Sequence, residues 1–231
     1  MHPEVLVEHI RKMKEATDKP WGINVPLLYP EIDRLMNIII QEGVKIVFTS
    51  AGSPKKWTPL LKSHGITVVH VISSTLFAKK CEEAGVDAVV AEGFEAGGHN
   101  GREETTTLTL IPNVVESCSL PVIAAGGISS GKSVAAAMTL GAEGVQIGTR
   151  FAVAAESSAH PTFKQRVFDT EEGGTMLALK KLAPTRLIKN DFFNQVKALE
   201  DAGAEAAQLT ELLGKGRAKK GIFEGDMTEG E

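Results

Sequence analysis

Short apolar runs alternate with amphipathic segments along most of this chain. The runs are rich in Val and Ile and nearly continuous in hydrophobicity, which is typical of strands buried on both faces. They cover residues 21–27, 45–52, 66–73, 87–93, 121–127 and 144–151. The intervening segments have helical periodicity and predict helices over 4–16, 30–42, 54–64, 74–84, 107–117 and 130–140. This alternation predicts βαβ units and a parallel sheet.

The punctuation of the helices supports these boundaries. Ser53 and Pro54 have the residue types of an N-cap followed by the first helical position. Glycine stands where four of the helices should stop, at Gly43, Gly65, Gly85 and Gly141.

Two folds are compatible with this order, an open doubly wound sheet and a (β/α) barrel. Almost every predicted strand ends in small or polar residues. Functional residues at the ends of all strands are typical of a barrel, whereas an open sheet has them at one switch point. We therefore predict a TIM-type (β/α) barrel. The strand ends are Asn24, Thr49-Ser50, Ser73, Glu92, Gly126-Gly127 and Gly148-Thr149.

The periodicity changes near Val153, and residues 153–231 predict a helical appendage or lid on a partial barrel formed by residues 1–152. Residues 190–216 have a strong helical pattern with a break at Gly203. The final stretch, "KKGIFEGDMTEGE", is polar and glycine-rich and predicts a loop.

Composition excludes several classes of partner. The chain has 231 residues and a formal net charge of −4, which disfavours nucleic acid or an anionic membrane as the main partner. No apolar run approaches a membrane span, and the N-terminus is not of the signal-peptide type. Cys81 and Cys118 have no metal-ligand spacing, so we expect free thiols, no metal site and a cytoplasmic protein.

Two successive predicted strands end in glycine, at "AAGGISSGKS" and "GVQIGTR". Free N–H groups there, together with a helix that starts near Ser129 and Ser130, favour a phosphate site. The alternative is a tight turn that merely needs Gly126 and Gly127. The segment from Gly126 to Ser133 also has Walker spacing, but no strand ends in the Asp that would hold magnesium, so Lys132 is better interpreted as a solvated helix residue.

The stretch "AEGFEAGGHNGREETTTLTL" (residues 91–110) places His99 among glycines after a strand. His99 there is a candidate general base or hydrogen-bond donor, or a purely structural residue. Thr105–Thr107 are most simply the cap of the next helix. The Asn24 amide could bind a heteroaromatic ligand or the backbone. We interpret His70 as a core residue.

Six segments in order, "WGINVPL", "FTSAG", "AEGFEAGGHNG…TTTLTL", "PVIAAGGI", "GAEGVQIGTRF" and "ESSAHP", resemble the FMN-dependent family of nitronate monooxygenases (2-nitropropane dioxygenases) and flavin-containing enoyl-acyl-carrier-protein reductases. The resemblance implies a (β/α)8 barrel with FMN at its C-terminal mouth. It also implies a small-molecule or acyl-carrier-protein-bound substrate and NAD(P)H as co-substrate of a reductase; a homodimer is compatible with it. The reductase branch is the slightly better match.

The resemblance also implies roles for individual residues. His99 matches the active-site histidine of the family. Asn24, Glu92, Gly97 and Gly98 would lie around the flavin ring and ribityl chain. The phosphate would be held by Gly126, Gly127, Gly148 and Thr149, with Gln146 nearby.

One departure from the family is that only six barrel strands can be counted instead of eight. The two strands that open the barrel in family members have no counterpart before "WGINVPL". Six strands cannot reproduce an eight-stranded closure with the same tilt and shear. The expectation is therefore a fragment, or a barrel completed by strands from elsewhere, with an inactive flavin-binding fragment as a further alternative.

Overall fold

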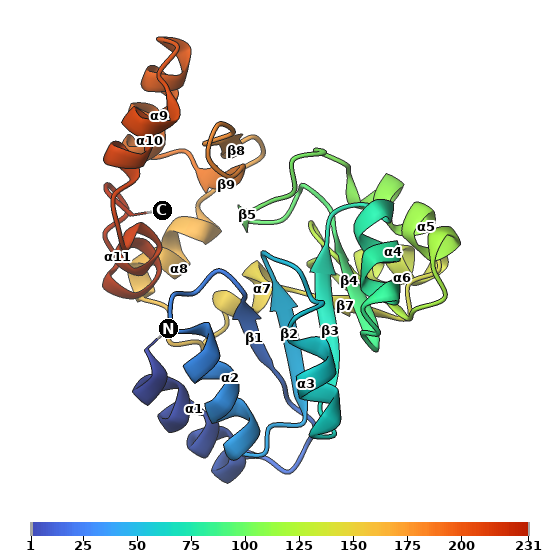
Figure 1. Cartoon of the computed structure of the whole chain (residues 1–231). Coiled ribbons are helices and arrows are strands. Elements are labelled where there is room, and N and C mark those ends of the chain that lie inside the picture. Colours follow the sequence, from blue (N-terminus) through green and yellow to red (C-terminus); the bar gives the residue numbers. More distant parts are fainter. Residues whose placement is uncertain (1, 231) are drawn as a thin grey trace.

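The computed structural model describes residues 2–230 and contains a six-stranded parallel sheet (Figure 1). Each strand pairs with the next parallel strand along the chain, in the order β1-β2-β3-β4-β6-β7. The predicted series of six strands is confirmed. They are β1 (Ile23–Pro26), β2 (Ile46–Ser50), β3 (Thr67–Ile72), β4 (Ala88–Glu92), β6 (Val122–Ala125) and β7 (Gly144–Gln146).

The two faces of this sheet differ in what covers them. Val47, Val68 and Val89 belong to the main core together with helix side chains such as Leu35 and Leu61. The opposite face carries a small cluster of Val69, Val90 and Ala125 with neighbouring strand residues, and no helix residue of the described chain belongs to it. Consecutive strand order with helices on one face is the arrangement of a (β/α) barrel rather than of a doubly wound sheet, which has helices on both faces.

Four of the helices around this sheet end where glycine was expected to stop them. Gly43, Gly65, Gly85 and Gly141 all have positive φ, between 67° and 99°. Such a left-handed residue terminates a helix at little cost when it is glycine. The helices are α1 (Pro3–Ala16), α2 (Ile32–Gln41), α3 (Thr58–Ser63), α4 (Thr75–Glu83), α5 (Thr107–Ser117) and α6 (Gly131–Thr139).

Two predicted boundaries were wrong. The helix expected over 54–64 begins only at Thr58, because residues 54–57 form a turn in which the Thr58 N–H and hydroxyl both bond the Pro54 carbonyl. The strand expected over 144–151 ends at Gln146, and a short helix, α7 (Thr149–Ala152), follows Gly148.

The chain beyond Val153 is helical only in part. Two strands, β8 (Thr175–Ala178) and β9 (Thr185–Ile188), form an antiparallel sheet with β5 (Gly98–His99) from the loop after β4. The loop predicted at the end of the chain was wrong in its first part, because residues 219–224 belong to α11, which lies between left-handed glycines at 216 and 225. The helices are α8 (Pro161–Phe168), α9 (Asp191–Asp201), α10 (Ala206–Leu213) and α11 (Arg217–Glu224).

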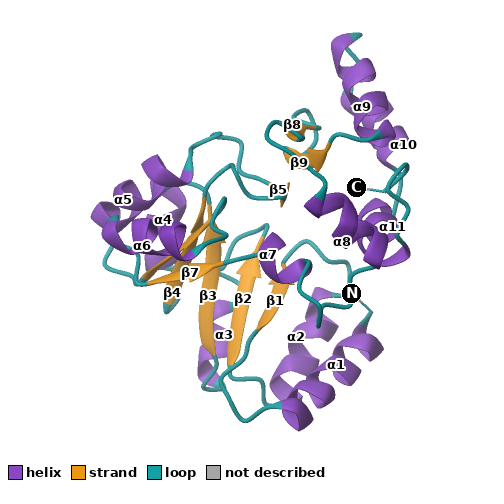
Figure 2. Cartoon of the chain, turned by 180° about the vertical axis from the view of Figure 1, so that it is seen from behind, coloured by secondary structure: helices purple, strands orange, loops and turns teal. Residues whose placement is uncertain are grey.

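These later elements lie beyond the ends toward which the parallel strands point (Figures 1 and 2). They have a second core, built around Phe192, Val196 and Leu209. Within residues 2–230, no helix combines the length and apolar character needed to cross a bilayer. The division at residue 152 stays a prediction, and Met1 and Glu231 lie outside the described residues.

Candidate active site at the carboxyl ends of the strands

A cavity of about 620 Å³ lies at the carboxyl ends of β4, β6 and β7. Its volume falls within the range of roughly 300–1,000 Å³ that is usual for small-molecule sites. The opposite walls come from α8, β9, α11 and the residues that follow α11. Every predicted site residue except Asn24 lines it: His99, Glu92, Gly97, Gly98, Gly126, Gly127, Gln146, Gly148 and Thr149.

The glycine-ended strands place backbone donors along one edge of the cavity. Parallel pairing of Ala125 with Gln146 brings the ends of β6 and β7 together, so the loops that carry Gly127 and Gly148 are neighbours. No acceptor within residues 2–230 receives a hydrogen bond from the N–H groups of Gly127, Gly148 or Thr149. Free backbone N–H groups of this kind are suited to a phosphate.

The start of α6 contributes less to this edge than the sequence indicated. Its N-cap is Ser130, as expected, but Ser130 and Ser133 form a reciprocal capping box. The Ser133 hydroxyl also accepts the N–H groups of Ser129 and Ser130 at 3.1 and 2.9 Å. Several N-terminal donors of the helix are therefore already satisfied. Lys132 is exposed, as interpreted from the sequence.

Gly126 occupies a position where only glycine fits. Its φ is +98°, and a Cβ atom there would lie 2.6 Å from the Gly93 carbonyl oxygen and 2.9 Å from the Thr107 hydroxyl. The loop after β6 therefore packs directly on the loop after β4, without a side chain between them.

Glu95 caps α5 close to where these two loops meet, and it was not identified from the sequence. Its carboxylate accepts hydrogen bonds from the backbone N–H and the hydroxyl of Thr107, and the same hydroxyl lies 2.9 Å from the Gly126 carbonyl oxygen. The role expected for Thr105–Thr107 is thus partly correct: Thr106 is the N-cap of α5, but the capping carboxylate comes from Glu95. Glu95 is twelve residues before Thr107, and Glu103 and Glu104 are nearer to the helix start, so the sequence offered no local signal for it.

Glu92 and Gln146 each pair in register with Ala125, one on each neighbouring strand. They therefore lie on the same face of the sheet as the small cluster to which Ala125 belongs. Both side chains are half-buried and line the cavity. Burial raises the pKa of the Glu92 carboxyl from 4.5 to about 7. Near neutral pH this group can therefore be protonated, so it can donate as well as accept a hydrogen bond.

His99 lies in β5, where it faces Thr185 of β9 across an antiparallel pair. Its side chain is exposed and borders the cavity, so a ligand there can reach the imidazole. Arg186 of β9 braces the same loop: Nε and Nη2 donate to the Phe94 carbonyl at 3.1 and 2.8 Å, and the guanidinium lies 5.2 Å from the Phe94 ring centroid. The sequence offered no local signal for Arg186, which is 92 residues away from Phe94.

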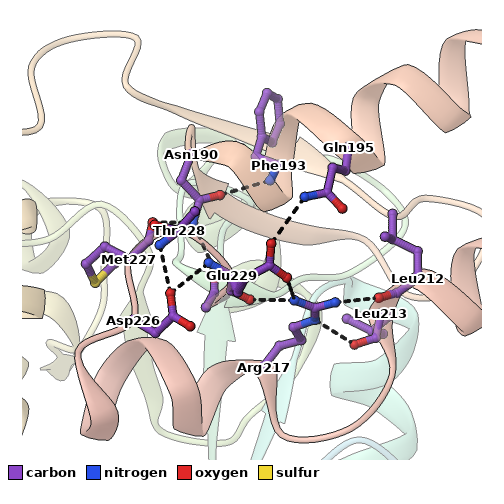
Figure 3. Close-up of polar contacts among 11 residues, drawn as sticks. Asn190, Phe193, Gln195, Leu212, Leu213, Arg217, Asp226, Met227, Thr228 and Glu229 are labelled. Atoms are coloured by element: carbon purple, nitrogen blue, oxygen red, sulfur yellow. Dashed lines mark hydrogen bonds and ion pairs between the residues drawn. The ribbon is translucent and has the colours of Figure 1, made fainter.

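The far wall of the cavity is largely apolar. Phe163 and Val167 of α8, Ile222 of α11, and Met227 contribute to it. Met227 belongs to the C-terminal segment (residues 226–230), which follows α11 and packs against α9. The Asn190 amide, at the N-cap of α9, donates to the Met227 carbonyl at 3.0 Å (Figure 3).

One guanidinium anchors this segment. Arg217 donates to the carbonyl oxygens of Leu212 and Leu213 at the end of α10 and to the carbonyl and carboxylate of Glu229 (Figure 3). Its side chain is 15% exposed, and its guanidinium lies 4.5 Å from the ring centroid of Phe192. These hydrogen bonds hold the C-terminal segment in place, and Met227 of this segment forms part of the apolar wall.

Two of the polar residues discussed from the sequence lie away from the cavity. Asn24 pairs in register with Phe48 and so lies on the sheet face of the small cluster around Val69 and Val90. It is exposed there, so water can satisfy the amide that was expected to need a protein or ligand partner. Its role at the flavin stays a prediction. His70 is buried on the helix-covered side and its Nδ1 lies 2.6 Å from the Thr49 hydroxyl, which confirms it as a core residue.

The comparisons with known proteins agree with this arrangement. The model of the nitronate monooxygenase family matches residues 30–231. A probable nitronate monooxygenase of Staphylococcus saprophyticus is 32% identical, and the match covers 93% of this chain and 66% of that protein. The chain spans about half to two thirds of the length of the curated relatives it matches.

Two solved structures extend the likeness to three dimensions. FabK from Thermotoga maritima is 39% identical with a TM-score of 0.93, over all of this chain and 73% of that one. A nitroalkane oxidase from Streptomyces ansochromogenes is 26% identical with a TM-score of 0.79, over 95% of this chain and 76% of that one. The sequence, the strand order and the cavity thus lead to one assignment: the chain belongs to the nitronate monooxygenase family, whose members are flavin-dependent oxidoreductases.

Proposed function

We propose that this protein is an FMN-dependent oxidoreductase. The observation that carries the proposal is the cavity at the strand ends, which combines free backbone donors, a glycine that admits no side chain and a reachable imidazole. Its volume, about 620 Å³, suits a flat cofactor and a small substrate group. The residues present fit FMN: Gly127, Gly148 and Thr149 offer N–H groups for the phosphate, while Glu92 and Gln146 offer polar groups for the ring.

When bound, the flavin supplies two-electron transfer between a donor and an acceptor substrate. The chain's own residues would orient both partners. Gly97 and Gly98 let the backbone approach the ring, since neither presents a side chain. His99 would hold or deliver a proton at the substrate atom where negative charge develops.

The first candidate reaction is reduction of an enoyl thioester. Hydride from NAD(P)H, oxidised to NAD(P)+, would pass by way of the flavin to one carbon of the C=C bond, and a proton would add to the other. The likeness to FabK, a flavin-dependent enoyl-acyl-carrier-protein reductase, supports this choice, because both its identity and its TM-score exceed those of the nitroalkane oxidase. The apolar wall around Phe163 and Ile222 would accommodate the acyl chain.

The second candidate is oxidation of an alkyl nitronate with O2, which the family match and the name of the Staphylococcus relative favour. Anaerobic mixing of the FMN-loaded protein separates the candidates. Bleaching of the flavin by NADH or NADPH supports the reductase. Bleaching by an alkyl nitronate, with none by either nucleotide, establishes the second candidate instead.

Cofactor binding itself is tested by an absorption spectrum. The purified protein should show flavin bands at about 370 and 450 nm, directly or after FMN is added. A protein that stays colourless would favour the remaining alternative, an inactive fragment without flavin chemistry of its own. The two free cysteines are the basis for proposing a cytoplasmic location.

A further inference from the structure

Asn100, the residue after His99, uses its side chain in an unusual way. The amide nitrogen Nδ2 donates two hydrogen bonds, to the carbonyl oxygens of Ala96 at 2.9 Å and Gly98 at 3.0 Å. The other end of the carboxamide, Oδ1, is buried and has no hydrogen-bond partner among residues 2–230. A buried acceptor without a partner is unfavourable, so the two hydrogen bonds donated by Nδ2 are what this side chain contributes to the structure.

The two carbonyl groups that accept from Asn100 determine where the N–H groups of the same peptide bonds point. None of the described peptide bonds is cis, and in a trans peptide the N–H points opposite to the C=O. Because the carbonyls of Ala96 and Gly98 converge on Asn100, the N–H groups of Gly97 and His99 point away from it. Gly97 and His99 line the cavity, and Asn100 does not.

Pairing with β9 leaves the His99 N–H free. The Asn100 N–H donates to the Pro184 carbonyl at 2.7 Å, and His99 is opposite Thr185. Hydrogen-bonded and non-hydrogen-bonded pairs alternate in an antiparallel ladder, so His99 is at a non-hydrogen-bonded position. Neither the Gly97 nor the His99 N–H has an acceptor within the described chain.

We propose that Asn100 is a positioning residue that turns the N–H groups of Gly97 and His99 toward the ligand, where they donate to an electron-rich oxygen or nitrogen atom. An ionised aspartate at this position would offer only acceptors to two carbonyls that need a donor, so the loop would turn away. The proposal rests on the proposed function only in taking FMN as the ligand.

Heteronuclear NMR with FMN as the probe tests this role. In the wild type, FMN should shift the amide proton signals of Gly97 and His99 downfield, as expected for new hydrogen bonds. Asn100→Asp should abolish both shifts and raise the Kd for FMN about thirtyfold, which corresponds to two lost hydrogen bonds. Asn37→Asp, an exposed position on α2, makes the same charge change and should behave as the wild type. If Asn100→Asp does not fold, Asn100→Ser, which removes the carboxamide without adding charge, carries the same expectations.

A second readout needs no ligand. If Asn100 holds the loop, the backbone amide at position 100, bonded to Pro184, should exchange with solvent about tenfold faster in Asn100→Asp or Asn100→Ser. Equal exchange rates in variant and wild type would overturn the proposal, as would FMN-induced shifts and Kd that the substitution leaves unchanged. A wild type that exchanges as expected but never binds FMN would instead refute the proposed cofactor, with Asn100 still assigned to the loop.

Discussion

The carboxylate of Glu95 accepts hydrogen bonds from the backbone N–H and the hydroxyl of Thr107, at 2.9 and 3.0 Å. This contact links the loop after β4 to the N-terminus of α5 and caps that helix. We expect Glu95→Ala to lower the free energy of unfolding by about 1 kcal/mol, the usual cost of a lost helix cap. It should also weaken FMN binding, because the Glu95 side chain lines the cavity beside Gly127. Denaturant unfolding and a flavin titration measure both effects. Glu116→Ala, an exposed site on the same helix, should change neither.

Gly126→Ala should be severe, because the new Cβ meets the Gly93 carbonyl oxygen at 2.6 Å. The positive φ adds about 1–2 kcal/mol of backbone strain. We expect a lower melting temperature and loss of bound flavin. Gly131→Ala is the matched control, since nothing lies within 4 Å of its Cβ and its φ is not positive. A Gly126→Ala protein that retains wild-type flavin affinity would show that the loop can move without harm to the site.

His99→Ala should keep the flavin and lose turnover. The proposed phosphate donors lie after β6 and β7, whereas the imidazole faces the cavity from β5, so cofactor binding does not depend on it. Loss of a positioned proton donor or acceptor typically lowers kcat about 100- to 10,000-fold. Bound flavin and turnover should be measured on the same sample, with the exposed His9→Ala as the control. Release of the flavin together with a lower melting temperature would make His99 a structural residue.

Stability should decline in acid because of His70. Burial lowers the pKa of this imidazole from 6.5 to about 4 in the folded protein. Between pH 6.5 and about 4, His70 therefore binds a proton in the unfolded chain but stays neutral in the folded protein. The free energy of unfolding should therefore fall by about 3 kcal/mol between pH 6.5 and pH 4.

Denaturant unfolding at a series of pH values checks this prediction. His70→Gln should flatten the pH dependence between pH 6.5 and 4 whatever its effect on stability at neutral pH. His64→Gln, at an exposed histidine that ends α3, should leave the slope unchanged. An identical slope in His70→Gln and the wild type would assign the acid sensitivity to other groups.

Arg217→Met should release the C-terminal segment, because methionine keeps the apolar contact with Phe192 but donates no hydrogen bond. The loss should be about 2 kcal/mol, as expected for hydrogen bonds to a charged, mostly buried group. Hydrogen exchange should show faster labelling of residues 226–230. Arg11→Met removes an exposed ion pair with Glu42 and should leave this segment protected. Unchanged labelling in Arg217→Met would show that Asn190 suffices to hold it.

The sequence by itself determined the local elements of the sheet. Apolar runs of strand length and left-handed glycines such as Gly85 specify strands and helix ends through local backbone preference, so these predictions were confirmed. Polar and glycine residues at strand ends also predicted the strand-end side of the cavity wall, because the carboxyl ends of parallel strands meet at one edge. Boundaries set by competing local contacts were missed, as at Thr58, where a turn precedes the helix.

Only the tertiary structure decided what closes the site from the other side. Arg186 reaches Phe94, and Met227 reaches the cavity, through contacts between segments far apart in the chain, and no local pattern encodes such pairings. The short strand β9 pairs both with β8 and with β5 from the His99 loop, and its own sequence does not encode the second of these partners. Asn24 shows the converse: its residue type predicted a partner, but its place at an exposed position of β1 allows water to fill that role.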